Sequence, residues 1–416
     1  MNQTLMHQEP KMPEDLQLFI NNARFYDKPS TPTTQFTHAE LSKALNFHRS
    51  MPGYAPTPLI SLPNLSRKLG IRNLYVKDES QRFGLKAFKV LGGAYAMARH
   101  IAERLGEDIS HLPFDTITSD EVRRAVGEVT FATTTDGNHG RGVAWTARQL
   151  RQKSVVYMPK GSSPQRLDAI RGEGAEASIV DMNYDEAVRM TAELARKHGW
   201  LVVQDTAWEG YEKIPLWIMQ GYGTIMLEAL QQLHEVPPTH IFIQAGVGSL
   251  AGSVQGMVVE AYGAFRSKVI VAEAKAADCL FRSAMAQRGE ALAVGGELST
   301  VMAGLACGEA NVIGWKILRD YADAFASCPD YVATRGMRML GNPLPGDTRI
   351  TSGESGAVTP GLLSILMQSP AMKETRERLR LGEDSRVLVV STEGDTDPQR
   401  YLDIVWDGEL ASYRKF

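Results

Sequence analysis

The stretch HIFIQAGVGSLAG, residues 240–252, joins an apolar run to a glycine-rich turn and then to a helical pattern. A strand that ends in such a turn is typical of parallel α/β sheets, where the first turn of the next helix offers unpaired N–H groups to an anion. Glycines allow the backbone of the turn to approach a bound phosphate closely. The stretch therefore predicts a parallel sheet with an anion-binding loop at its edge.

Similar strand-like runs recur from residue 73 onward, separated by longer segments with helical periodicity. They are NLYVKD (73–78), VTFATTT (129–135), SVVYMP (154–159), ASIVD (177–181), LVVQD (201–205), KVIVAEA (268–274) and RVLVVST (386–392). Apolar strands that alternate with helices predict an α/β fold with parallel-type sheets covered by helices on both faces. A chain of 416 residues is long enough for two domains.

The glycine loop has three interpretations. Gly246-x-Gly248-x-x-Ala251 fits the dinucleotide-binding fingerprint, and Glu273 lies about where that fingerprint has its ribose-binding acid. This favours a nicotinamide-dependent oxidoreductase. The same loop also suits another phosphate, or a tight turn that needs glycine only for its geometry. Other motifs have to decide among the three.

Lys89, in GLKAFKVLGG (84–93), lies beside an apolar helix face. Helical spacing aligns Phe88, Leu91, Tyr95, Ala98, Ala102 and Leu105 on that face. It places Lys89 about 100° round the axis from Phe88. A lysine there can extend its ammonium to solvent while its stem packs. If it is desolvated instead, its pKa is lowered and the neutral amine can attack a carbonyl group. The position suits both interpretations.

A polar turn in FATTTDGNHGRGVAW (131–145) brings Thr134, Thr135, Asp136 and Asn138 together at the start of a predicted helix. Asp and Asn are favoured in helix caps, which is the simplest explanation. The alternative is a cradle for a substrate carboxylate, with Asp136 as a neighbouring acid or base. Three threonines in a row are more hydroxyls than a cap needs, so Thr134, Thr135 and Asp136 are candidate substrate-binding residues.

Four motifs in this order, AFKVLGGAYA, DGNHGRGVA, GVGSLAG and VVSTEGD, resemble the fold type II family of pyridoxal-phosphate enzymes. The family includes serine and threonine dehydratases and the tryptophan synthase β chain, and the resemblance covers nearly everything after about residue 50. Within it, VKDES, TTTDGNHGRGVAW, VVQDTAWEGY and SGESGAV are similar to the ammonia-lyases of 2,3-diaminopropionate. Asp136 precedes GNH where dehydratases have a short serine-rich segment, which favours the lyases.

The resemblance implies that pyridoxal 5'-phosphate is the cofactor and that Lys89 binds it covalently. It places Asn138 against the ring hydroxyl and either Ser391 or Thr392 at the pyridine nitrogen. The implied phosphate loop consists of Gly246, Val247, Gly248, Ser249, Leu250, Ala251 and Gly252.

The implied reaction is the α,β-elimination of 2,3-diaminopropionate, from both the D and L isomers, to pyruvate and two ammonia. Lys89 and Asp136 would each serve one isomer, and Asp205 would hold the leaving ammonium. Gly92 and Gly93 would leave room for the flat cofactor. A serine or threonine dehydratase, the oxidoreductase and an inactive ligand-binding member remain as alternatives.

Charge and composition favour a small-molecule partner, here an amino acid. Lys plus Arg total 45 against 48 Asp plus Glu, without long runs of one sign, which argues against nucleic acid and anionic membranes. Cys279, Cys307 and Cys328 lack metal-site spacing, so we expect reduced thiols and no metal. The start of the chain has no signal-like segment, and the uncharged run 241–259 is too polar to span a bilayer, so we expect a cytoplasmic protein.

We expect three parts in the chain. Residues 1–50 are polar and proline-broken and form an extension without chemistry of its own. Residues 51–90 with 222–416 form a larger cofactor-binding domain, and residues 91–221 form a smaller domain. The resemblance also suggests a homodimer.

Overall fold

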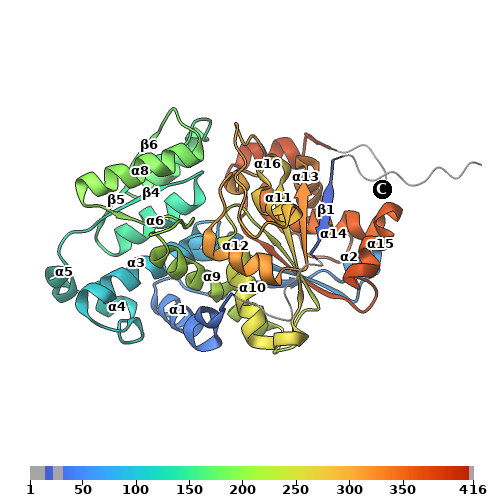
Figure 1. Ribbon diagram of the computed structural model, residues 1–416, viewed down its shortest axis with the longest axis horizontal. Coiled ribbons are helices and arrows are strands. Elements are labelled where there is room, and N and C mark those ends of the chain that lie inside the picture. Colours follow the sequence, from blue (N-terminus) through green and yellow to red (C-terminus); the bar gives the residue numbers. More distant parts are fainter. Residues whose placement is uncertain (1–14, 22–30, 412–416) are drawn as a thin grey trace, which may run out of the picture.

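The computed structural model describes residues 15–21 and 31–411, which form two lobes around two separate sheets (Figure 1). The larger sheet has the strand order β1-β10-β9-β8-β11-β3-β2, and the smaller one has the order β6-β5-β4-β7. In the larger sheet the strands are β1 (Gln17–Ile20), β2 (Leu59–Ser61), β3 (Asn73–Asp78), β8 (His240–Gln244), β9 (Lys268–Ala274), β10 (Ala324–Cys328) and β11 (Arg386–Ser391). In the smaller sheet they are β4 (Thr130–Thr134), β5 (Lys153–Met158), β6 (Glu176–Ile179) and β7 (Leu201–Val202).

The predicted parallel pairing holds for the interior of the larger sheet and for all of the smaller one. The two edge strands of the larger sheet are antiparallel to their neighbours: β1 pairs with β10, and β2 pairs with β3. Each of the eight predicted runs contains a strand, whereas β1, β2 and β10 were not predicted. The α/β fold class with helix-covered parallel sheets is confirmed.

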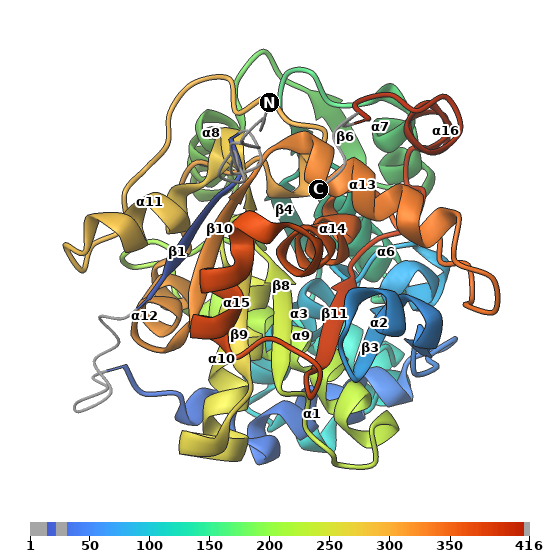
Figure 2. The same ribbon diagram turned by 90° about the vertical axis from the view of Figure 1, so that its right-hand side faces the viewer.

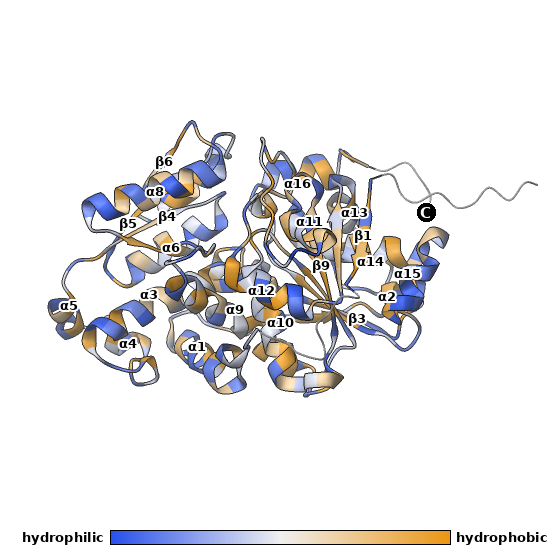
Figure 3. Cartoon of the chain, in the orientation of Figure 1, coloured by the Kyte–Doolittle hydropathy of each residue, from blue (hydrophilic) through white to orange (hydrophobic). Residues whose placement is uncertain are grey.

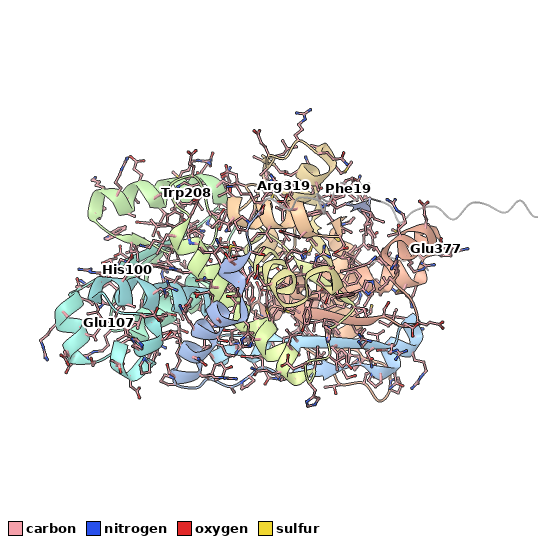
Figure 4. The ribbon with its side chains drawn as sticks, turned by 60° about the horizontal axis from the view of Figure 1, so that its bottom comes forward. Phe19, His100, Glu107, Trp208, Arg319 and Glu377 are labelled. Carbon is pink, nitrogen blue, oxygen red and sulfur yellow. The ribbon has the colours of Figure 1, made fainter. Side chains whose placement is uncertain are left out.

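Helices cover both faces of the larger sheet, with α13, α14 and α15 on the face seen in Figure 2. The helices are α1 (His38–Ser50), α2 (Pro63–Leu69), α3 (Val90–Leu105), α4 (Phe114–Ile117), α5 (Asp120–Val126), α6 (Asn138–Gln149), α7 (Pro164–Gly172), α8 (Tyr184–His198), α9 (Lys213–Gln232), α10 (Ser249–Tyr262), α11 (Cys279–Ala286), α12 (Val312–Tyr321), α13 (Asp330–Gly341), α14 (Glu354–Gln368), α15 (Lys373–Leu379) and α16 (Pro398–Val405). Glu107, just after α3, and Glu377, on α15, lie towards opposite ends of the molecule (Figure 4).

The core follows from this layering. Every residue of β8 is buried, which suits a central parallel strand that has helices on both sides. Figure 3 shows the contrast between the hydrophobic strands of the larger sheet and the mixed polar surfaces of outer helices such as α8 and α15.

Helix α3 is buried all round over its first turns and not on one face only. A Cβ atom on Gly92 would lie 2.6 Å from the side chains of both Ile218 and Tyr222, on α9. On the other side of the contact, a Cβ atom on Gly221 would lie 2.5 Å from the carbonyl oxygen of Leu91. The expectation that Gly92 makes room for a cofactor is therefore corrected, because the space it leaves is filled by α9.

The described part of the N-terminal extension belongs to the body of the protein. Strand β1 adds to the edge of the larger sheet, and α1 packs on α9 and α3. The strands of the smaller sheet all fall within residues 91–221, in keeping with the expected domains, whose boundaries stay a prediction.

Two further features concern the membrane and the thiols. Across residues 15–21 and 31–411, we find no helix with the length and apolar character needed to span a bilayer. All three cysteines are buried free thiols.

Candidate active site

A cavity with about 540 Å³ of free space, part of it open to solvent, lies where the carboxyl ends of β8 and β11 face the starts of α3, α6 and α10. Crevices at the carboxyl ends of the strands in open α/β sheets are the usual place for a ligand. The cavity is lined by Phe88, Lys89, Asn138, Asp205, Tyr222, Gln244, Ala245, Gly246, Val247, Gly248, Ser249, Leu250, Gly304, Leu305, Cys307, Ser355, Thr392 and Glu393. Among the predicted site residues, the lining omits Thr134, Thr135, Asp136, Ala251, Gly252 and Ser391.

Lys89 is the residue directly before α3. It lines the cavity, and its amino group lies beside a carboxylate. Its Nζ atom lies 2.8 Å from Oδ2 of Asp205, and the two side chains are only 14% and 4% exposed. Burial opposes the ammonium form, but Asp205 and Asp136 together raise the pKa of Lys89 well above its ordinary value. The interpretation in which burial lowers the lysine pKa therefore does not describe this structure. The carboxylates outweigh the desolvation.

Asp205 is the ion-pair partner that holds the amino group of Lys89 in place. Burial alone would raise its pKa, but the charges of Lys89 and His139, together with hydrogen bonds to the carboxylate, lower the pKa of Asp205 to about 2. Its backbone carbonyl accepts hydrogen bonds from the Ser249 hydroxyl and from Nδ2 of Asn311, the latter at 3.1 Å. Asn311 also donates to Ser249 Oγ at 2.8 Å and caps α12. Asp205 is thus tied to the glycine loop through Asn311, a residue that the sequence did not point to.

The glycine loop runs from β8 into α10 and faces the cavity from Gly246 to Leu250. Gly248 has φ +94°, a left-handed conformation that favours glycine. The start of the 14-residue helix α10 therefore presents N–H groups and a positive helix end to the cavity, as an anion site requires. Gly252 serves another purpose, since a Cβ atom there would lie 2.7 Å from Cα of Gly314 on α12.

Glu273, the acid needed for the dinucleotide interpretation, is occupied elsewhere. Its two carboxylate oxygens accept hydrogen bonds from the backbone N–H groups of Leu280 and Phe281, at 2.8 and 2.6 Å. The side chain is completely buried beneath α11, and burial raises its pKa well above the ordinary value. A ribose cannot reach this carboxyl group, so the oxidoreductase interpretation loses its support.

The threonine hydroxyls in the polar turn hold the protein itself. Thr134 Oγ1 donates to the Ala187 carbonyl at 3.1 Å, and Thr135 Oγ1 accepts from the N–H groups of Gly137 and Gly140, both at 2.9 Å. Both side chains are almost fully buried. The expectation that these hydroxyls bind substrate is not supported by the geometry, because both have partners within the protein: groups of α8 for Thr134 and backbone N–H groups of its own turn for Thr135.

Asp136 differs from its neighbours. Its Oδ2 atom is buried and has no hydrogen-bond partner among the residues that the structure describes. A Cβ atom built on Gly304, a residue of the cavity wall, would lie 3.6 Å from this oxygen. The carboxylate therefore lies next to the cavity with one oxygen free to interact.

Asn138, the first residue of α6, lines the cavity and donates a hydrogen bond from Nδ2 to Oε2 of Glu393. The other oxygen of Glu393 accepts from the backbone N–H of Ser355 at 3.0 Å. Glu393 is 2% exposed and lines the same cavity. It was missed from the sequence, where a single acid after a strand gives no signal.

The two hydroxyl residues at the end of β11, Ser391 and Thr392, have different surroundings in the structure. Thr392 lines the cavity, and its Oγ1 accepts a hydrogen bond from Gln244 Nε2 at 2.8 Å. Ser391 is fully buried and donates to Ser352 Oγ at 2.8 Å. Successive residues of a strand point to opposite faces, so only one of the two can face a ligand.

These groups suit an aldehyde cofactor that carries a phosphate. Lys89 offers an amine, and the start of α10 offers N–H groups for the phosphate. Gln244 Oε1, Tyr222 OH and Ser355 Oγ are buried cavity-lining atoms without hydrogen-bond partners in the described part of the chain. Buried polar atoms are normally paired, so free ones around a cavity indicate a polar ligand. The cavity therefore fits pyridoxal phosphate.

Comparison with known proteins agrees with the fold and the cavity. A family model described as "Pyridoxal-phosphate dependent enzyme" matches residues 51–393, and the chain belongs to this class of enzymes. Diaminopropionate ammonia-lyase of Escherichia coli strain K12 is 50% identical over 399 residues, which are 95% of this chain and 98% of that protein. The chain is accordingly a member of the diaminopropionate ammonia-lyase family.

Two solved structures of the Escherichia coli enzyme extend the comparison. The complex with D-serine has a TM-score of 0.88 at 48% identity and covers 95% of this chain and 98% of that one. The complex with an aminoacrylate–PLP azomethine reaction intermediate has a TM-score of 0.87 at 48% identity, with coverage of 97% and 99%. The predictions of the family and of the cofactor are thereby confirmed.

Proposed function

We propose that the protein catalyses the α,β-elimination of 2,3-diaminopropionate, from both its D and L isomers, to pyruvate and two ammonia. The observation that carries the proposal is the arrangement of one lysine and two carboxylates at one cavity. Lys89 lies 2.8 Å from Asp205, and the unpaired Oδ2 of Asp136 lies at the cavity wall. The name of the Escherichia coli relative and its complex with D-serine support the substrate class and the D isomer.

Pyridoxal phosphate, when bound, supplies a ring that accepts the electron pair left at the α carbon when its proton is removed. Lys89 would hold it covalently, the N–H groups of residues 246–250 would hold its phosphate, and Asn138 would face its ring hydroxyl. We assign Thr392 and not Ser391 to the pyridine nitrogen, since Thr392 lines the cavity.

Proton transfer is assigned to two residues. A planar cofactor has two faces, and a base on one face removes the α proton from one isomer only. Lys89 would remove the α proton of the L isomer. Asp136 acts on the D isomer from the other face.

The leaving group needs a different residue. The β-amino group leaves as neutral ammonia, and the C–N bond breaks readily only when that group is protonated. Asp205 suits this task because a carboxylate at the cavity attracts a substrate ammonium. Water then hydrolyses the released enamine product to pyruvate and the second ammonia.

We also propose that the working form is a homodimer in the cytoplasm. The likeness of the chain to its family supports the homodimer, and its three free cysteines, which are typical of a reducing compartment, support the cytoplasm. The molar mass from size-exclusion chromatography with light scattering tests the assembly: twice 45.8 kDa is expected, and a monomer would contradict it.

Borohydride trapping tests the assignment of Lys89. The visible absorption of the purified protein should disappear on reduction, and a peptide containing Lys89 should gain the mass of the reduced cofactor. Lys86 is the matched control, because it lies three positions away but pairs with Asp395 at 2.8 Å outside the cavity lining. Reduced cofactor found on Lys86, or a Lys86→Ala variant that no longer gains the cofactor mass, would contradict the assignment.

A further inference from the structure

Arg166, on α7, is a buried guanidinium with few partners. Its side chain is 9% exposed, and within the described part of the chain Nη2 donates a single, long hydrogen bond, 3.4 Å, to Thr396 Oγ1. Its Nε atom is buried and has no partner among residues 15–21 and 31–411. A buried guanidinium is expensive unless it is paired with carboxylates and hydrogen-bonded. Arg166 therefore has donor capacity that the rest of the fold does not use.

The nearest carboxylate oxygen with unused capacity is Oδ2 of Asp136. It lies 3.8 Å from Nη1 of Arg166, too far for a hydrogen bond but close enough for strong attraction in a buried place. Burial opposes the charge of Arg166, but Glu393, Asp136, Glu354 and Asp397 together raise the pKa of Arg166, with Glu393 having the largest effect among the four. Two buried groups of opposite charge, each with an unpaired atom, thus face each other beside the cavity.

The backbone of the polar turn keeps the two groups together. A Cβ atom on Gly137 would lie 2.8 Å from Cδ of Arg166, and 3.3 Å from its Cβ and Cγ atoms. The φ angle of Gly137 is +151°, which L side chains rarely adopt. The stem of Arg166 therefore lies directly on the residue after Asp136, in space that only glycine leaves free.

We propose that Arg166 is a positioning residue for Asp136 and that it acts selectively in the turnover of the D isomer. Its guanidinium attracts the Asp136 carboxylate and thereby holds it beside the cavity wall, where it can reach the substrate. Arg166 itself keeps its proton throughout, as arginine does in proteins. The inference rests on the proposed function of Asp136 as the base for the D isomer.

An alternative is that Arg166 only joins the two lobes through Thr396. The two explanations differ in what they predict for the isomers. Loss of a clamp between lobes disturbs the whole cavity, including Lys89, and lowers turnover of both isomers equally. Loss of a partner of Asp136 lowers turnover of the D isomer alone.

The experiment compares Arg166→Ala and Arg166→Lys with the wild-type holoenzyme on D- and L-diaminopropionate. In Arg166→Ala we expect kcat for the D isomer to fall about 100-fold, as a small misplacement of a reacting group does, with KM and the L isomer little changed. In Arg166→Lys, kcat for the D isomer should lie between the wild-type and Arg166→Ala values, because lysine keeps the charge but not the planar guanidinium group. Millimolar guanidinium should restore D turnover in Arg166→Ala.

Arg171→Ala is the matched control on the same helix, since Arg171 donates to the Ala177 carbonyl at 3.0 Å and not to Asp136. Equal losses on both isomers, or D turnover that stays at the wild-type rate in Arg166→Ala, would overturn the inference. Absence of D turnover in the wild type would instead refute the proposed function. If Arg166→Ala fails to fold, Arg166→Lys alone decides by its ratio of D to L turnover.

Discussion

Replacing Asp205 by Asn tests the buried pair at the centre of the site. The change keeps the shape of the side chain but removes the charge that compensates Lys89, 2.8 Å away. We expect the cofactor-free protein to lose stability at neutral pH, because a buried ammonium is left without its nearest carboxylate.

The magnitude follows from the pKa of Asp205, about 2 in the folded protein against an ordinary value of 3.8. One pKa unit corresponds to about 1.4 kcal/mol, so the carboxylate contributes about 2 kcal/mol to folding at pH 7. Because the folded pKa lies below the unfolded one, this contribution is present above about pH 4. It is lost as the pH falls toward 2, and about half of it should remain at pH 3.

Urea unfolding of cofactor-free wild type and Asp205→Asn at pH 7 and pH 3 measures the effect. The difference in the free energy of unfolding should be about 2 kcal/mol at pH 7 and smaller at pH 3. Asp181→Asn is the control, since Asp181 and Lys160 form a pair at 2.9 Å whose side chains are 85% and 74% exposed. Such a pair contributes little. Equal stability of wild type and Asp205→Asn at pH 7, or a difference that grows on acidification, would refute the reasoning.

Further predictions concern turnover and the cofactor. Lys89→Ala should abolish both the visible absorption and turnover, because covalent binding and proton removal fail together; turnover in this variant would contradict the assignment. Asp136→Asn should lower kcat for the D isomer about 100- to 10,000-fold, the usual range for a lost general base, and leave the L isomer largely unaffected. Equal losses on both isomers would disprove the assignment of one base to each face. Thr392→Val should shift the visible spectrum of the holoenzyme, whereas Ser391→Ala should not, and the opposite pattern would reverse the choice between these two hydroxyls.

The sequence predicted the interior strands well because each is a short β-branched run between helical segments. It missed β10, whose AFASC sequence has no strand-like pattern, and β2, which has only three residues. It also missed β1, which lies in a polar region and adds to a sheet edge more than 300 residues along the chain. Strands that depend on such distant pairing leave little local signal.

The same limit applies to the site. Lys89 and Asn138 lie in motifs that indicate a site only when they are taken together with the glycine loop and the late strand. Asn311 and Glu393 gain their roles only from partners 106 and 255 positions away, Asp205 and Asn138. Arg166 likewise faces its carboxylate only once α7 has packed on the polar turn.

Local chemistry explains two differences between the sequence interpretation and the structure. The Thr135 hydroxyl serves the backbone of its own turn, which a count of hydroxyls cannot show. The pKa of Lys89 is raised and not lowered, because burial was considered without the carboxylates that the fold brings beside it.

The stoichiometry of the reaction tests the proposed function most directly. Purified holoenzyme is supplied separately with D-diaminopropionate, L-diaminopropionate and L-serine, and both pyruvate and ammonia are measured. We predict two ammonia for each pyruvate from either isomer of diaminopropionate. Release of one ammonia per pyruvate from serine, with no turnover of diaminopropionate, would contradict the account and identify a dehydratase.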